Sequence, residues 1–452
     1  MTPSSEPSSS SSTSEPVIQQ IVEPTAAPIV SEPLTETTFV ATAGGTDDPP
    51  APVKGIRRLL VWIAPANFAV FVLWGAIPGI LLPQQVTLLN PSDKVANLAL
   101  VSTIGAFAAM VAQPVAGQIS DRTRARFGRR APWMVLGALA GALSLVGLAF
   151  ANSLWGIAIA WTLVQITFNF VQGPLSAIMP DRVPVARRGT FAALTGIGAM
   201  VGALGGQIVG SMFFNSLAAG YIVFAVFTLL VTLLFVAFNP DHPSTNITPE
   251  PFKFIDFVKT FWVNPIAYPD FFWAFIGRLF LYTGYFAVTG YQLYILTDYL
   301  HVKEPQEVIP LLGILSLAGV IIATLVSGPL SDKVGRRKPF VFASSVVTGL
   351  ALVFPWLSPT LGSWMIMTVV AGLGFGMFQA VDTALMSQVL PSAKSFAKDL
   401  GVVNIAATLP QTLAPAVAGG IVLAFGYAGL FPVGIVLSIL GAFAVWFIKS
   451  TR

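Results

Sequence analysis

The chain of 452 residues contains no cysteine and only two histidines. The absence of cysteine excludes disulfide bonds and thiol catalysis, and with two histidines no zinc-binding signature remains. No Gly-Lys dipeptide occurs, so the chain lacks the phosphate-binding loop that would support ATP-driven pumping. The sequence therefore gives no sign of an enzyme, and neither a metal nor a cofactor is expected.

Charged residues are scarce as well. They make up 10% of the chain against 55% hydrophobic residues, with a mean hydropathy of +0.77, whereas a soluble domain carries about 25% charged residues. A helix needs about 20 apolar residues to cross about 30 Å of hydrocarbon. The predicted spans are 59–82, 95–116, 132–151, 154–179, 189–212, 217–238, 271–298, 308–329, 339–357, 363–390, 400–424 and 428–448. We expect an all-α protein with twelve transmembrane helices, embedded as a monomer in the lipid bilayer.

One charged phrase occurs twice. GQISDRTRARFGRR begins at Gly117 and GPLSDKVGRRK begins at Gly328, and each joins two apolar spans. The aspartates of the two phrases, Asp121 and Asp332, lie 211 residues apart. Parallel repeats of this kind build many secondary transporters from two halves. The predicted parts are two pseudo-symmetric six-helix bundles, residues 55–238 and 271–452, and a cytoplasmic linker, residues 239–270.

Loop charge predicts the orientation. Placing the N-terminus and every second loop on one side collects 21 of the 24 lysines and arginines there, with only Lys94 and Lys303 on the other side. The positive-inside rule then predicts a cell-membrane protein with both termini in the cytoplasm. The loop charge would face anionic lipid headgroups, and no nucleic-acid partner is implied.

Two segments are expected outside the membrane. Residues 1–53 hold seven acidic residues, no basic residue and many serines and prolines, so residues 1–54 are predicted to be a disordered cytoplasmic tail without a cleaved signal peptide. Within the linker, the amphipathic stretch 252–262 predicts a helix on the membrane surface, or a lead-in to the seventh span.

The stretch AQPVAGQISDRTRARFGRRAPWM, residues 112–134, resembles the loop between the second and third helices of the major facilitator superfamily. Its basic run, with VDTALMSQVLP from Val381 and KDLGVVNIAATLPQTLAP from Lys398, more narrowly resembles sucrose transporters and the glycoside–pentoside–hexuronide symporters. The resemblance implies a secondary transporter whose two bundles rock about a central site and carry a sugar or glycoside.

The resemblance also implies that the two basic loops latch the halves together in one access state. The residues concerned are Gly117, Asp121, Arg122, Gly128, Arg129, Arg130, Gly328, Asp332, Arg336 and Arg337. Gly117 and Gly128 are expected to permit tight turns, and Asp121 to accept from a helix N-terminus or a neighbouring arginine. The alternative is a topology signal alone, although that does not predict an aspartate at the same place in both halves.

Ionisable groups inside membrane helices mark the candidate site, because each costs about 2.5 to 3.5 kcal/mol at the bilayer centre. Arg278 and Asp382 lie about 10 and 12 Å from the same end of their predicted helices at 1.5 Å per residue. We expect them to pair, with Asp382 carrying a proton and Arg278 as its partner. A purely structural pair that fixes helix register is the alternative.

Further polar and aromatic residues reach the same depth on one face of four helices. They are Asn67, Trp74, Gln165, Asn169, Gln172, Tyr282, Tyr285 and Gln379. The resemblance places these four helices around the transport cavity. Amides can bridge adjacent hydroxyls and aromatic rings can cover a sugar face, so we expect this set to bind substrate. The alternatives are amides that hold helices together and aromatic residues that only pack.

The predicted function is proton-coupled symport of a sugar or glycoside by alternating access. No carboxylate is predicted inside the first six helices, which argues against sodium coupling of the melibiose type and leaves facilitated diffusion open. The alternatives are proton-coupled efflux of drugs or metabolites and, from another class, a membrane sensor or scaffold. Asp298, His301 and His242 are at helix ends or in loops and are expected to be solvated.

Overall fold

The computed structural model describes residues 55–241, 243–245, 265–389 and 396–449, all within one compact unit. The predicted tail, residues 1–54, and the amphipathic stretch of the linker, residues 252–262, lie outside the described residues.

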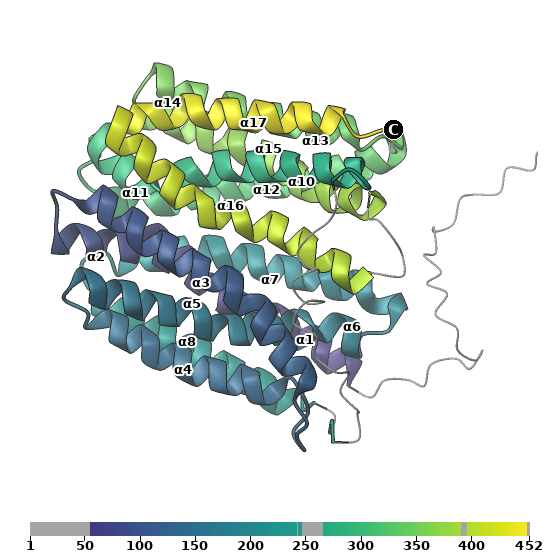
Figure 1. Ribbon diagram of the computed structural model, residues 1–452. Coiled ribbons are helices and arrows are strands. Elements are labelled where there is room, and N and C mark those ends of the chain that lie inside the picture. The colour runs from purple at the N-terminus through teal and green to yellow at the C-terminus, as the bar shows by residue number, and fades with distance from the viewer. Residues whose placement is uncertain (1–54, 242, 246–264, 390–395, 450–452) are drawn as a thin grey trace, which may run out of the picture. The chain divides into compact units, whose positions relative to one another are not determined.

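Helices make up both halves, and Figure 1 shows them running side by side. The first half contains α1 (Ile56–Ala76), the π-helical turn η1 (Ile77–Leu81), α2 (Leu82–Leu89), α3 (Lys94–Arg122), α4 (Ala131–Ala149), α5 (Leu154–Ser176), α6 (Ile178–Arg182), α7 (Val185–Met212) and α8 (Leu217–Phe238). The second contains α10 (Pro269–Thr289), α11 (Gln292–Tyr294), the π-helical turn η2 (Ile295–Tyr299), α12 (Pro305–Val334), α13 (Lys338–Ala351), α14 (Val353–Leu357), α15 (Leu361–Gln388), α16 (Phe396–Phe425), the 3₁₀ turn η4 (Tyr427–Gly429) and α17 (Leu430–Trp446).

Among the described residues, eleven helical segments are long and apolar enough to cross a membrane. The remaining predicted span, 400–424, corresponds to α16, which is 30 residues long and contains the shorter apolar stretch Leu413–Phe425. The twelve predicted spans are therefore found in order, and the protein is an integral multi-pass membrane protein.

Glycines allow the helices within each half to approach closely. A Cβ added at Gly75 of α1 would lie 1.8 Å from the carbonyl oxygen of Ala203 of α7, a distance that no side chain tolerates. In the second half, a Cβ at Gly441 of α17 would lie 2.8 Å from the carbonyl oxygen of Gly277 of α10. Because apolar side chains gain little by leaving lipid, such close packing between small residues is a main source of helix association in membranes.

Three predicted spans differ from the observed helices. The first continues from α1 through η1 to the end of α2, because a π-helical turn accommodates Pro78, which has no N–H to donate. The predicted span 271–298 was wrong as one helix, because α10 ends at Thr289 and the poor helix former Gly290 begins a turn before α11. The predicted span 339–357 is divided at Leu352, where Pro355 cannot donate to the carbonyl of Ala351.

The two ends of the molecule differ in charge. We call the end that carries the loops 123–130 and 335–337 the basic end. The other end, called the opposite end, holds α2, α11, η2, α14 and η4, and lies at the left of Figure 1.

Candidate functional site

A buried ion pair joins α10 to α15. The Nε atom of Arg278 lies 3.4 Å from Oδ2 of Asp382, and the two residues are 8% and 3% exposed. Within the described part of the chain, neither of these two atoms has a hydrogen-bond partner. The structure thus brings the two predicted charges together, and it leaves each with unused bonding capacity. A pair that is buried but incompletely satisfied is poorly explained by stability alone.

Aromatic and amide side chains surround this pair in the second half. Tyr282, one helical turn from Arg278, has its ring centre 5.3 Å from the guanidinium carbon and donates its hydroxyl to Oε1 of Gln379 at 2.9 Å. Tyr285 stacks on Phe375 with ring centres 4.5 Å apart. These predicted residues therefore form one polar and aromatic layer between α10 and α15.

The first half presents a matching pair. Trp74 of α1 donates its indole N–H to Oε1 of Gln172 of α5 at 3.1 Å, and its ring meets Trp161 edge to face at 6.2 Å. Trp74 and Tyr285 are 211 residues apart, so they hold equivalent positions in the two repeats. Each half therefore places an aromatic residue and a glutamine on its first and fourth membrane helices.

The remaining predicted amides of the first half point elsewhere. Asn67 donates to the carbonyl of Ile63 at 2.9 Å, and Asn169 donates to the carbonyl of Gln165 at 2.7 Å, both within their own helices. Gln165 itself is half-buried. These two donor groups are therefore used along their helices and do not bridge α1 to α5.

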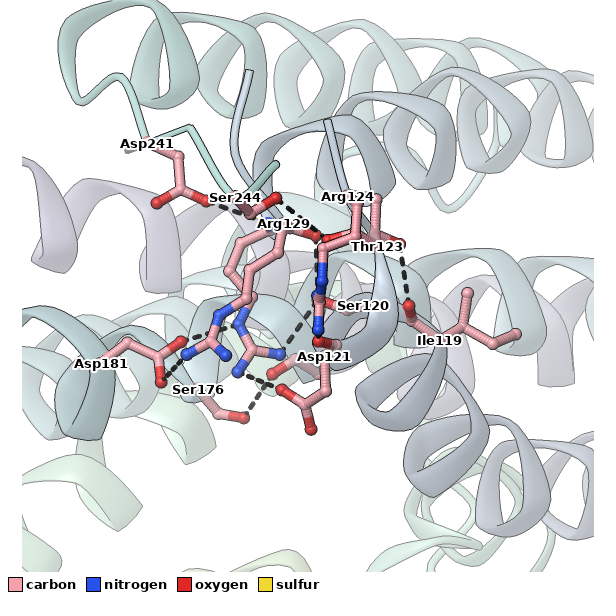
Figure 2. Close-up of polar contacts among 12 residues, drawn as sticks. Ile119, Ser120, Asp121, Thr123, Arg124, Arg129, Ser176, Asp181, Asp241 and Ser244 are labelled. Atoms are coloured by element: carbon pink, nitrogen blue, oxygen red, sulfur yellow. Dashed lines mark hydrogen bonds and ion pairs between the residues drawn. The ribbon is translucent and has the colours of Figure 1, made fainter. Parts of the chain in front are cut away.

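At the basic end, a network of charges is built around Arg130. Its side chain contacts Asp121 at 2.5 Å and Asp181 at 2.9 Å, while Arg129 contacts Asp181 at 2.6 Å. The backbone N–H of Arg130 donates to Asp241 at 3.0 Å. Figure 2 shows these contacts converging from α3, the loop before α4, α6 and the segment after α8. The side-chain ion pairs all join residues of the first half, whereas Asp241 lies at the start of the linker. Neither Asp181 nor Asp241 was predicted.

The second basic loop is a reduced version of the first. Arg337 lies 3.5 Å from Asp332, whose side chain is 70% exposed, and Arg122 and Arg336 are exposed. In each loop a glycine in the left-handed region precedes the ion-paired arginines: Gly128 at φ 88° before Arg129 and Arg130, and Gly335 at φ 64° before Arg337. The described ion pairs of Arg129, Arg130 and Arg337 each join residues of one half, so a latch between halves stays a prediction.

The expected turn at Gly117 was wrong. Gly117 lies inside α3 and Gly328 lies inside α12, both in regular helix. A Cβ at either position would meet no atom within 4 Å, so neither turn geometry nor close packing requires glycine there. In the second repeat the turn is made by Gly335 instead.

Asp298, which was expected to be solvated, is only partly so and has side-chain partners. Its side chain is 28% exposed and accepts from Lys94 Nζ at 2.7 Å and from the Tyr427 hydroxyl at 2.7 Å. His301 is exposed, as expected, and His242 lies outside the described residues.

Comparison with known proteins matches the family model described as MFS/sugar transport protein over residues 94–425. The chain is 24% identical to the class H tetracycline resistance protein of Pasteurella multocida over 66% of this chain and 73% of that protein. It is 29% identical to the monosaccharide-sensing protein 3 of Arabidopsis thaliana, over 26% of this chain and 16% of that protein.

Among solved structures, the nucleoside transporter NupG superposes with a TM-score of 0.70 at 14% identity, over 86% of this chain and 99% of that one. This likeness shows the fold of two six-helix bundles. Because the family model covers most of the chain, the protein belongs to the MFS/sugar transport family of the major facilitator superfamily and transports small molecules across a membrane.

Proposed function

We propose that this protein is a proton-coupled symporter of a sugar or glycoside that works by alternating access as a monomer in the cell membrane, with both termini cytoplasmic. The observation that carries the proposal is the buried pair of Arg278 and Asp382 beside aromatic and amide side chains. The family match to sugar transport proteins supports the substrate class.

Proton coupling follows from the chemistry of the pair. Asp382 can take up a proton, whereas arginine stays charged at any physiological pH. Protonation of Asp382 would remove the attraction to Arg278 and leave the guanidinium to Tyr282 and to an incoming hydroxyl. Loss of the proton on the other side would restore the pair. Asp382 is the only buried carboxylate among the described residues, so no cluster of buried acids supports sodium binding.

The polar layer suits an uncharged polyol. Gln172 and Gln379 each accept from a ring donor of their own half, at 3.1 and 2.9 Å. A sugar hydroxyl could replace either donor without leaving the glutamine oxygen unsatisfied, because a hydroxyl can donate to that oxygen and also accept from the displaced ring donor. Trp74 and Tyr285 offer apolar ring faces for the C–H side of a sugar.

A second candidate is proton-coupled efflux of drugs or metabolites. The match to a tetracycline resistance protein over 66% of the chain favours it. The same aromatic layer and buried acid would then bind an apolar or cationic solute. A sensor or scaffold, the alternative from another class, would require no uphill transport.

Proteoliposomes provide the test. Sugar symport predicts that a disaccharide from a panel, added outside, carries protons in and acidifies the lumen. Efflux by exchange predicts that an apolar cation added outside enters as protons leave, so that the lumen becomes more alkaline. Uphill accumulation by protein lacking residues 1–54 would exclude a sensor that works through that segment.

The coupling role is tested by Asp382→Asn. We expect loss of uphill accumulation with retained counterflow of labelled substrate, because exchange needs no net proton movement. Glu304→Gln, which neutralises an exposed acid outside the two basic loops, is the control. Full accumulation by Asp382→Asn would remove this residue from the mechanism.

A further inference from the structure

Three residues from different parts of the chain meet at the opposite end. Lys94 is the first residue of α3, Asp298 lies in η2 and Tyr427 opens η4. Both carboxylate oxygens of Asp298 are used: Oδ1 accepts from Lys94 at 2.7 Å and from Thr297 at 2.9 Å, and Oδ2 accepts from Tyr427 at 2.7 Å. We call Lys94, Asp298 and Tyr427 the Asp298 cluster. It connects the first half to two helices of the second.

A neighbouring contact locates this cluster on the molecular axis. The hydroxyl of Tyr294, one turn before Asp298, donates to the carbonyl of Pro83 at 2.9 Å, and the two residues are 211 positions apart. They are therefore repeat mates. The halves of such a transporter are related by a pseudo-two-fold axis along the membrane normal. Two equivalent positions can touch only close to that axis, so this contact lies over the central path.

The Asp298 cluster is tied to that axial contact. The Lys94 ammonium lies 5.0 Å from the ring centre of Tyr294, within the range of a cation–π interaction. At the same end, a Cβ at Gly419 of α16 would lie 2.4 Å from the Cβ of Ala99 of α3, so these helices also touch across the halves.

The backbone around the contact is irregular in both halves. The π-helical turn η1 ends two residues before Pro83, and η2 begins immediately after Tyr294. π-Helical turns inside membrane helices are uncommon and occur frequently at functional sites. Each half thus has a locally irregular helix where it meets the other.

We propose that the Asp298 cluster is the gate at the opposite end: Lys94 and Asp298 hold the two halves together over the central path, and they must separate before substrate can pass there. Lys94 and Asp298 are 18% and 28% exposed on their side chains, so water can reach the pair and replace its partners when it opens. Partial exposure therefore suits a contact that forms and breaks in every transport cycle.

The experiment measures the distance across the opposite end in purified full-length protein. Because the chain has no cysteine, spin labels on Asn152→Cys and Leu357→Cys, both exposed at this end in different halves, would be the only labels. We expect Asp298→Asn and Lys94→Gln each to shift the population toward the longer distance by about 5- to 150-fold, the usual range for a coupling between sites. Lys303→Gln, an exposed lysine of the same end outside the cluster, is the matched control and should change nothing.

A variant with the two charges exchanged shows whether a shift in the single variants comes from the lost ion pair or from misfolding. The double variant Lys94→Asp with Asp298→Lys restores the attraction and should return the distribution toward that of the parent. An unchanged distribution in both single variants overturns the proposal, as does an equal shift in Lys303→Gln. The measurement needs no substrate, so its result is independent of whether the solute is a sugar.

Discussion

Replacing Arg278 and Asp382 by neutral residues, singly and together, tests whether their side chains act as one ion pair or as two independent polar residues. The variants are Arg278→Gln, Asp382→Asn and the double variant. Each single change leaves one buried ionisable group without its partner, and the double change leaves none. If the 3.4 Å contact is the main electrostatic interaction of both residues, the losses in free energy of unfolding caused by the two single changes must not add in the double variant.

The expected magnitudes follow from burial. Breaking a buried pair by removing one partner costs about 3 to 5 kcal/mol. After Asp382→Asn the guanidinium cannot lose its proton, and the contact that it keeps with the ring of Tyr282 is worth only about 0.5 to 2 kcal/mol. After Arg278→Gln the carboxyl of Asp382 can take up a proton, at a cost of about 1.4 kcal/mol for each unit by which the pH exceeds its pKa. We therefore expect Asp382→Asn to be the more destabilising variant and the double variant to be more stable than either.

Unfolding of purified protein by a denaturing detergent measures these effects as changes in the apparent free energy of unfolding. The double-mutant cycle should give an interaction of at least about 2 kcal/mol, the upper part of the range for residues in contact. Asp332→Asn, which breaks an exposed pair, should cost less than about 1 kcal/mol. A double variant as unstable as the sum of both single variants would refute the reasoning.

Three further predictions concern packing, the basic loops and pH. Gly75→Ala should destabilise the protein by about 1 to 3 kcal/mol or more, because its Cβ would overlap a carbonyl of α7, whereas Gly147→Ala meets open space and should be neutral or stabilising in the same unfolding assay. Asp121→Asn should shift the protein toward the state open at the basic end more than Asp332→Asn does. The reason is that Asp121 pairs with a buried arginine at 2.5 Å, whereas Asp332 pairs with a more exposed one at 3.5 Å. Equal shifts in label distances across that end would contradict this prediction. Burial acts to raise the pKa of Asp298, which lies beyond the end of α10, but hydrogen bonds from Lys94, Tyr427 and Thr297 outweigh it and lower the pKa. With Tyr294 and Tyr427 neutral, the gate interaction is then present above the ordinary carboxyl pKa of about 4 and is lost only as pH falls through the lowered pKa of Asp298. The label distance across the gate should therefore stay constant between about pH 8 and pH 5.

The sequence was informative where a physical rule links residues far apart. A repeat of 211 residues predicts two equivalent halves, and burying a charge in the membrane is so costly that Arg278 and Asp382, at matching depth, were expected to pair. The structure places them 3.4 Å apart. Their role in proton coupling is a separate matter of chemistry and stays a prediction.

The sequence was uninformative where local composition is ambiguous. Asp298 follows an apolar stretch and precedes a polar loop, which is equally typical of a solvated helix end and of a gate residue. Its partner Lys94 offered one signal, since it is one of two basic residues on that side. Gly117 was misleading for the opposite reason, because a glycine beside a charged loop suggests a turn, yet the helix continues for five more residues to Arg122.

Repeat mates along the first membrane segment of each half, α1 to α2 and α10 to α11, order the central path into layers. Asn67 is equivalent to Arg278, Trp74 to Tyr285 and Pro83 to Tyr294, because each two residues are 211 positions apart. At 1.5 Å per residue the second layer lies about 10 Å from the first, and the third about 13 Å farther toward the opposite end. The ion pair, the aromatic and amide layer and the gate therefore follow one another along the axis. A solute entering through the gate would meet Trp74 and Tyr285 before Asp382, so bound substrate would separate the proton carrier from that end of the path.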